Sequence, residues 1–320
     1  MAGGSSSGSG SQSESGSKGA ILRSRYRFRS LPRRRPTRCA VPKSEAPALR
    51  VRTFYGLLVV LLLAGSDLRA QQTTDDLRKL ARNPVGDAVR VPMVESISFD
   101  AGPYDRTSHS LQILSVIPLQ IAKNWLLIPR IAATPVAYLP DVTQAGGGST
   151  GIGDTVATFF LTPSNTGRII WGVGPSLLIP TATDSNIGAG KWDLGPSLAV
   201  LAQPKWGSAL VVVQNIWSLP VNSRRSSAHQ MQIETSLSYN LPHDWYVVTA
   251  PTINADWTQS GGDRWLIPFG GGIGRTLIIA NQAVDLSVAL YSFAIRPARQ
   301  LTPKWQISLQ CTLIYPRKRK

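Results

Sequence analysis

A chain of 320 residues with a formal net charge of +16 invites comparison with nucleic-acid-binding proteins, but its charge lies at the two ends. Residues 1–70 carry 13 Lys and Arg against 3 Asp and Glu; residues 71–320 carry 21 against 15, and four of those 21 are the last four residues. The rest of the chain is close to neutral, which argues against nucleic acid as a partner. Cys39 and Cys311 are the two cysteines, too few for a disulfide scaffold or a cysteine-based zinc site.

The first 50 residues are expected to be a disordered basic extension. Residues 1–20 are a Gly and Ser tract, and the Arg-rich stretch "RSRYRFRSLPRRRPTRC" follows; such segments bury too little apolar surface to fold. Because so long an extension is unusual ahead of an export signal, we expect the native start to lie near Val51. A basic arm for nucleic acid and a twin-arginine export signal are the alternatives.

Residues 51–70 have the three regions of a secretory signal peptide. Arg52 precedes the apolar run "FYGLLVVLLLAG" at 54–65, and the small-residue site "LRA" ends at Ala70. This run is too short to cross a bilayer as a helix, which takes about 20 residues. We therefore expect export with cleavage after Ala70, the alternative being a short buried helix.

Residues 71–92 are expected to form a periplasmic N-terminal segment with one short helix. Asp75 and Asp76 are suited to cap a helix that reaches Arg82, and Asn83-Pro84 ends it. Beyond this point we find no further helical period.

Apolar and polar residues alternate along the remainder of the chain. In "HQMQIETSLSYNL" (229–241) polar side chains hold one parity and most apolar ones the other, and "AVDLSVAL" (283–290) shows a similar pattern. This period predicts strands with one polar and one apolar face. About twelve strands are expected, at residues 93–102, 109–121, 125–139, 152–162, 168–181, 192–203, 207–221, 229–241, 245–257, 265–279, 283–296 and 304–315.

The connections between these strands alternate in length. Tight ones hold "AKN", "PSNTG", "PKW", "PHD" and "ANQ"; longer ones hold "GPYDRTS", "PDVTQAGGGSTG", "TDSNIGAGK", "NSRRSSA", "TQSGGDR" and "RPARQLT". An even strand number with short turns on one rim and long loops on the other is typical of outer-membrane barrels. The predicted fold class is all-β: an antiparallel transmembrane β-barrel of about 12 strands at 93–316, with short periplasmic turns, longer extracellular loops and a basic tail at 317–320.

Tryptophans support the same interpretation. Trp125, Trp206 and Trp245 lie beside short turns, Trp305 begins the last strand, and Trp192, Trp257 and Trp265 lie beside long loops. Aromatic residues are favoured at both membrane interfaces. The alternative is a secreted, soluble all-β binding domain with tryptophans in its core.

Several short motifs resemble a bacterial family of outer-membrane barrels labelled as transporter-like proteins of the phenol meta-degradation pathway. They are "DDLRKLARNPVGD" before the first strand, "GIGD" at 151–154, the prolines before short turns (Pro163, Pro204 and Pro242) and the ending Tyr315-Pro316. The resemblance covers residues 75 to about 316. It implies a membrane barrel that passes small, often aromatic molecules and supplies no catalytic residues. The N-terminal extension and the "RKRK" tail depart from the family pattern.

The polar parity of the strands identifies candidate lumen-lining residues. These are Arg130, Gln232, Glu234, Ser236, Asp256, Asp285, Ser287, Gln306, Ser308 and Gln310. Charges of both signs inside a narrow barrel usually pair. The set either forms a structural plug or lines a path for a small solute, because a 12-stranded barrel is intermediate between filled barrels and aqueous pores.

Catalytic and metal-binding patterns find little support. "GGSTG" at 147–151 matches a hydrolase elbow but stands in a glycine-rich loop before a strand, and "NIGAGKW" lacks the Ser or Thr and the helix of a phosphate loop. His109, His229 and His243 are scattered over strand ends and turns. We therefore expect no enzyme, no cofactor and no metal site.

The function expected from the sequence is a channel or passive transporter for small, aromatic or hydrophobic molecules in the cell outer membrane. Its expected partners are outer-membrane lipid, a small-molecule solute and the barrel-assembly machinery. The alternative is a non-conducting structural or surface-contact barrel of the envelope.

Overall fold

The fold is described from a computed structural model, which covers residues 88–164, 167–220, 229–279, 282–297 and 301–316. The expected extension, signal peptide, short helix and basic tail lie outside these residues. Within the described ranges, no helix is long and apolar enough to cross a membrane.

All strands of the described chain belong to one antiparallel sheet. Their bounds are β1 Ala88–Ala101, β2 Arg106–Val116, β3 Leu119–Ala122, β4 Trp125–Pro140, β5 Gly148–Gly151, β6 Thr155–Pro163, β7 Ile169–Ile179, β8 Asp193–Ala202, β9 Gly207–Ser218, β10 His229–Asn240, β11 Trp245–Thr249, β12 Thr252–Asp256, β13 Trp265–Ile279, β14 Gln282–Ile295 and β15 Trp305–Pro316. A 3-10 turn, η2 (Gly261–Arg264), precedes β13.

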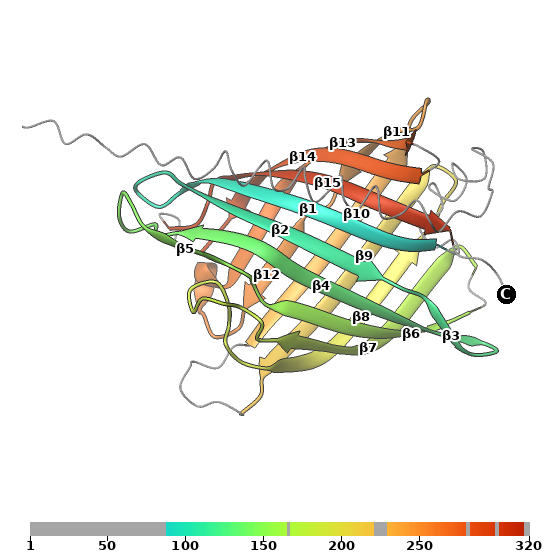
Figure 1. The fold of residues 1–320 in the computed structure, drawn as a ribbon, viewed down its shortest axis with the longest axis horizontal. Helices are drawn as coiled ribbons and strands as arrows, with labels where there is room; N and C mark the ends of the chain where they lie inside the picture. Colours follow the sequence, from blue (N-terminus) through green and yellow to red (C-terminus); the bar gives the residue numbers. More distant parts are fainter. Residues whose placement is uncertain (1–87, 165–166, 221–228, 280–281, 298–300, 317–320) are drawn as a thin grey trace, which may run out of the picture. The chain divides into compact units, whose positions relative to one another are not determined.

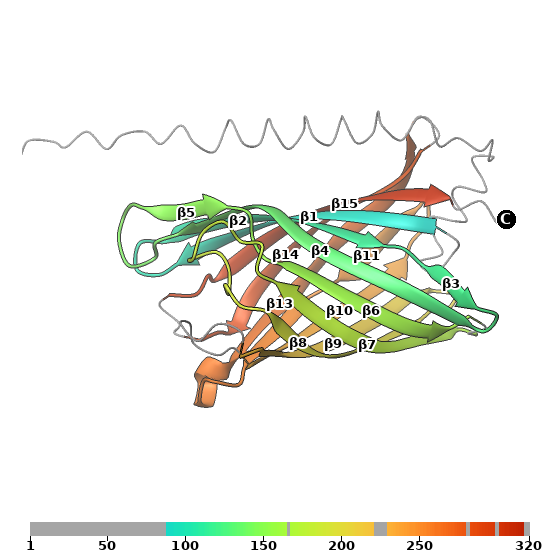
Figure 2. The ribbon, with the colours of Figure 1, turned by 60° about the horizontal axis from the view of Figure 1, so that its bottom comes forward.

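The sheet closes on itself as a barrel (Figure 1, Figure 2). β1 pairs with β15, and β10 pairs with β9 on one side and with β11 and β12 on the other. β2 with β3, β5 with β6, and β11 with β12 each form one interrupted barrel strand, so the 15 segments make twelve barrel strands. The predicted antiparallel 12-stranded barrel is confirmed.

The interruptions and one strand start differ from the expected boundaries. β1 begins at Ala88 instead of residue 93, because Ala88–Pro92 find pairing partners on β15. Residues 88–92 therefore belong to the barrel and not to the segment before it. Pro118 separates β2 from β3 and Pro251 separates β11 from β12, since proline cannot donate a ladder hydrogen bond.

The two rims carry different connections. Residues 123–124 and 241–244 make short turns at the rim where Ala88 pairs with Pro316. Loops 180–192 and 257–264 lie at the opposite rim. The connection after β1 was expected to be long, but it contains only residues 102–105, because β1 and β2 stay paired as far as Ala101 and Arg106.

The barrel interior is identified by one ion pair. Arg130 lies on β4 and Glu234 on β10, on opposite sides of the closed sheet, and their side chains form a salt bridge. Such a contact runs only through the interior, so the parity of these two residues faces inward. Cross-strand pairing extends this assignment to the other strands, because directly paired residues point to the same face.

The opposite parity forms an apolar outer surface. Phe269 is 79% exposed, Leu290 50% and Leu237 47%. Tryptophans lie at both ends of this surface: Trp245 at the short-turn rim, and Trp257, Trp265 and Trp305 at the long-loop rim. Arg275 also points outward, where its guanidinium lies 5.2 Å from the centre of the Trp245 ring. Its long stem allows the charge to reach the rim instead of staying among apolar side chains.

Candidate functional site

A transverse ion pair crosses the middle of the barrel interior. Arg130 donates to Glu234 Oε2, and the two side chains are 12% and 26% exposed. Pairing opposite charges offsets the cost of removing both from bulk water, whereas either one alone would be left uncompensated. The two predicted lumen residues thus lie together and bridge strands that are far apart in the sequence.

A row of amide and hydroxyl side chains surrounds this ion pair. Gln214 donates to Glu234 Oε1 at 3.1 Å and to Gln232 Oε1 at 3.2 Å. Gln232 in turn donates to Asn254 Oδ1 at 3.3 Å. Ser176 donates to Gln214 Oε1 at 3.0 Å. These bonds hold Glu234 in place and make the ion pair part of a network across β7, β9, β10 and β12.

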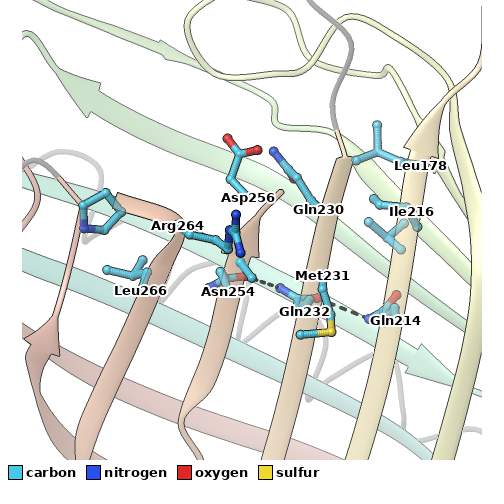
Figure 3. Close-up of a pocket in the computed structure, with 13 residues that line it drawn as sticks. Leu178, Gln214, Ile216, Gln230, Met231, Gln232, Asn254, Asp256, Arg264 and Leu266 are labelled. Atoms are coloured by element: carbon cyan, nitrogen blue, oxygen red, sulfur yellow. Dashed lines mark hydrogen bonds between the residues drawn. The ribbon is translucent and has the colours of Figure 1, made fainter. Parts of the chain in front are cut away.

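A cavity of ≈ 350 Å³ lies against this network, on the side of the long loops (Figure 3). Its lining combines apolar side chains with amides: Val156, Leu178, Ile216 and Leu266 alternate around it with Gln214, Gln230, Gln232 and Asn254. Small-molecule sites likewise combine apolar walls with polar groups that orient the ligand. The arrangement is suited to a compact, largely apolar solute.

Charged residues frame the outer end of this cavity. Asp256 accepts hydrogen bonds from the backbone and hydroxyl of Thr258, at 2.9 and 2.6 Å. Arg264, from η2, lies with its guanidinium 5.4 Å from the centre of the Trp257 ring and donates to the carbonyl of Gln259. Both side chains are engaged at the loop end of the cavity, where Leu178 and Leu266 also lie, and Gln214 and Gln232 lie deeper in the barrel (Figure 3).

A second inward cluster is built around Asp285 on β14. Tyr246 donates to Asp285 Oδ2 at 2.7 Å and Thr276 donates to Oδ1 at 2.9 Å. The Tyr246 ring reaches Asp285 across β13, where Gly274 leaves it space: a Cβ at that position would lie 2.2 Å from Tyr246 Cζ. Tyr246 on β11 and Asp285 are therefore connected across the intervening strand. Their cluster is separate from the transverse ion pair.

Ser236, Gln306, Ser308 and Gln310 face inward outside both clusters, whereas Ser287 hydrogen-bonds to Tyr246 of the Asp285 cluster. Gln306 donates to Ser96 Oγ at 3.3 Å, and Gln310 donates to Thr312 Oγ1 at 3.0 Å. Ser236 on β10 pairs with Leu210 of β9. Ser287 on β14 and Ser308 on β15 also lie on the inward parity of their strands. The predicted set thus splits into the central network, the Asp285 cluster and a polar wall on β15.

Several residues of the two clusters and the cavity were not among the candidates, and Gln214, Asn254, Arg264 and Arg90 show why. Gln214 shares its parity with Val212 and Ile216, so the alternation on β9 is hidden. Asn254 has the parity of Asp256 and was available to sequence reasoning. Arg264 lies in a loop, and Arg90, whose charge acts on Asp285, lies in the segment expected to precede the barrel.

Two histidines of the barrel have aromatic or acidic neighbours. His229 lies between two tryptophans, its ring centre 5.2 Å from that of Trp217 and 6.1 Å from that of Trp257. His109 contacts Glu95 at 3.7 Å on the outward parity. Across the part of the chain that the structure describes, no group of three or more His, Cys, Asp or Glu is placed to hold a metal ion.

Comparison with known proteins relates the fold to solved barrels. No family profile and no curated protein sequence matches the chain. An outer-membrane channel from Pseudomonas putida F1 is 14% identical, covers 77% of this chain and 100% of its own, and has a TM-score of 0.52. The monoaromatic hydrocarbon channel CymD is 10% identical over 76% of this chain and 92% of its own, with a TM-score of 0.38. Outer membrane phospholipase A from Escherichia coli is 12% identical over 74% and 94%, with a TM-score of 0.39. What the similarity to the Pseudomonas channel shows is the barrel fold.

Proposed function

We propose that this protein is a passive channel of the cell outer membrane for small hydrophobic, often aromatic, molecules. The apolar outer surface between two tryptophan-bearing rims is what a barrel in a bilayer requires. The solved barrel from Pseudomonas putida F1, whose fold this chain resembles, is itself an outer-membrane channel. Its immediate partners would be lipid, the solute and the machinery that inserts barrels. The narrower similarity to phenol-pathway transporter-like proteins agrees with this proposal, and no enzymatic activity is part of it.

The observation that carries the proposal is the cavity inside the barrel. It offers ≈ 350 Å³, which is within the size range of small-ligand pockets. Its apolar side chains favour an apolar solute, since removing apolar surface from water stabilises the bound state by about 25 cal/mol per Å². Its amides remain able to bind a hydroxyl group or the edge of an aromatic ring.

Filling the cavity tests the proposal. Ile216→Trp places a large ring in the cavity and should lower the initial rate of uptake of radiolabelled toluene by intact cells several-fold. Val211→Trp is the matched control, because Val211 lies on the same strand but points outward and is 42% exposed. It should leave uptake unchanged. Equal uptake by the two variants at equal amounts of folded barrel would count against the cavity as the solute site.

A non-conducting structural barrel is the second candidate, favoured by the transverse Arg130–Glu234 pair that crosses the interior. Planar-bilayer recording separates the two. A channel for small solutes should give a small, reproducible conductance and protein-dependent hydrocarbon uptake. A correctly folded barrel that gives neither would be a structural one.

A further inference from the structure

The backbone ladder is interrupted where β11 and β12 face β13. The β12–β13 ladder has two pairs, Asn254 with Leu266 and Ala255 with Trp265. The β11–β13 ladder runs from the pair Trp245–Arg275 to the pair Val248–Gly272. Among the residues that the structure describes, no backbone pairing joins Thr249–Ile253 to Ile267–Gly271. The pairing register is the same on both sides of this gap, so an inserted residue, as in a β-bulge, does not cause the gap. We call these two facing stretches the wall window.

Pro268 explains part of the gap in this ladder. The carbonyl of Pro251 accepts from Thr235 of β10 at 3.1 Å, and because polar groups alternate along a strand, those of Ala250 and Thr252 face β13. Register places Thr252 opposite Pro268, which has no N–H to give. The same register places Ala250 opposite Gly270. The N–H of Ala250 and the carbonyl of Gly270 are hydrogen-bonded to side chains instead of to each other.

Side chains occupy the backbone groups that Ala250 and Gly270 would otherwise exchange. The N–H of Ala250 donates to the hydroxyl of Tyr291 at 2.9 Å, and Thr249 Oγ1 donates to the carbonyl of Gly270 at 2.7 Å. Tyr291 is paired with Gly270 on the inward parity and is 4% exposed. Its side chain therefore crosses the glycine from β14 and bonds to the far edge of the wall window. These two bonds satisfy the N–H of Ala250 and the carbonyl of Gly270 without a backbone pairing between the strands.

The wall window lies beside the cavity and level with the transverse ion pair. Asn254 and Leu266, which line the cavity, are the paired residues at one end of the window. Glu234 is paired directly with Thr252 inside it. On the outward parity Phe269 is the most exposed of the large apolar side chains of the described chain, at 79%. A solute in the cavity thus meets a charged, hydrogen-bonded barrier along the axis and an apolar margin at the side.

We propose that the wall window is a lateral exit, through which an apolar solute leaves the cavity for the membrane, and that Tyr291 closes it. This inference rests on the proposed function and specifies its route. Passage between strands that are already unpaired breaks no backbone ladder; it requires the Tyr291 side chain to release Ala250 and swing aside, and the Thr249 hydroxyl to release the Gly270 carbonyl. Passage along the axis requires separation of Arg130 from Glu234, which is costly because each charge would be left partly buried and alone.

A reversible bridge across the wall window tests this route. Pro251→Cys with Phe269→Cys, made in a Cys39→Ser and Cys311→Ser background, provides two outward thiols at facing positions. A short bifunctional methanethiosulfonate reagent should bridge them whether or not the strands are within disulfide distance, and peptide masses report the bridge. The control is Val247→Cys with Ile273→Cys, a paired and outward rung of the same wall.

Uptake of radiolabelled toluene by intact cells is measured before bridging, after it, and after reduction. The bridged window should lower the rate several-fold, with recovery on reduction, while the bridged control keeps its rate and both retain their ion conductance. Tyr291→Ala should raise the rate in the unbridged protein. An unchanged rate with the window fully bridged would overturn the lateral exit. If Ile216→Trp still lowers uptake in that case, the proposed function stands and the route is axial; if the protein supports no uptake at all, the proposed function itself fails.

Discussion

Arg130→Gln should make the barrel cation-selective and raise its conductance several-fold. The guanidinium of Arg130 spans the interior to Glu234 and is the positive half of the transverse barrier. Removing it opens the middle of the lumen and leaves a carboxylate facing the pathway. A ring or patch of one charge sign sets ion selectivity in narrow pores. Single-channel conductance and the reversal potential in a KCl gradient measure both effects.

The opposite and restoring variants make this result specific. Glu234→Gln should also raise the conductance but shift the reversal potential toward chloride, because Arg130 then remains alone. The exchange Arg130→Glu with Glu234→Arg rebuilds the pair and should return the conductance toward the low value of the native barrel. Reversal potentials of the same sign in the two single variants would show that this pair does not line the ion pathway.

Val288→Arg should destabilise the folded barrel by about 2–4 kcal/mol, the cost of a basic residue at the bilayer midplane on a lipid-facing position. Val288 lies midway along β14, points outward and is 44% exposed. Urea unfolding in lipid vesicles, followed by tryptophan fluorescence and by heat-modifiable migration on gels, measures the loss.

Gln310→Arg is the matched control for this prediction. Gln310 lies one strand away on β15, at a similar depth, but on the inward parity, where its side chain bonds to Thr312. The variant should unfold within about 1 kcal/mol of the native protein, since charges are tolerated in a polar lumen. A larger loss for Gln310→Arg than for Val288→Arg would mean that the two faces have been assigned the wrong way round.

Most of the twelve barrel strands were predictable because they contain enough alternation to define their own faces. The stretch from Trp305 to Pro316 is an example: Gln306, Ser308 and Gln310 hold one parity through the whole strand, and the structure places that parity inward. Turn residues such as His243 and Asp244, both at positive φ, mark the tight connections. Local patterns of this kind depend on no distant partner.

The central site was less accessible, because its geometry depends on contacts between distant strands. Arg130 and Glu234 were each identified as lumen residues, yet they are 104 positions apart, and no local pattern indicates that they meet. Gln214 was missed because its inward neighbours Val212 and Ile216 are apolar, as the cavity requires. The wall window was beyond reach for the same reason: Pro251 and Pro268 indicate interruptions, but their alignment follows only from the register of β12 with β13.

The central claim is that the barrel interior admits small apolar molecules in preference to polar ones of similar size. Its most direct test compares initial uptake rates of radiolabelled toluene and of a polar solute of similar mass, such as serine, in cells with and without the protein. We predict a protein-dependent rate for toluene that is at least about tenfold larger than the protein-dependent rate for serine. Equal rates for the two solutes, or a toluene rate that the protein does not change, would contradict the account.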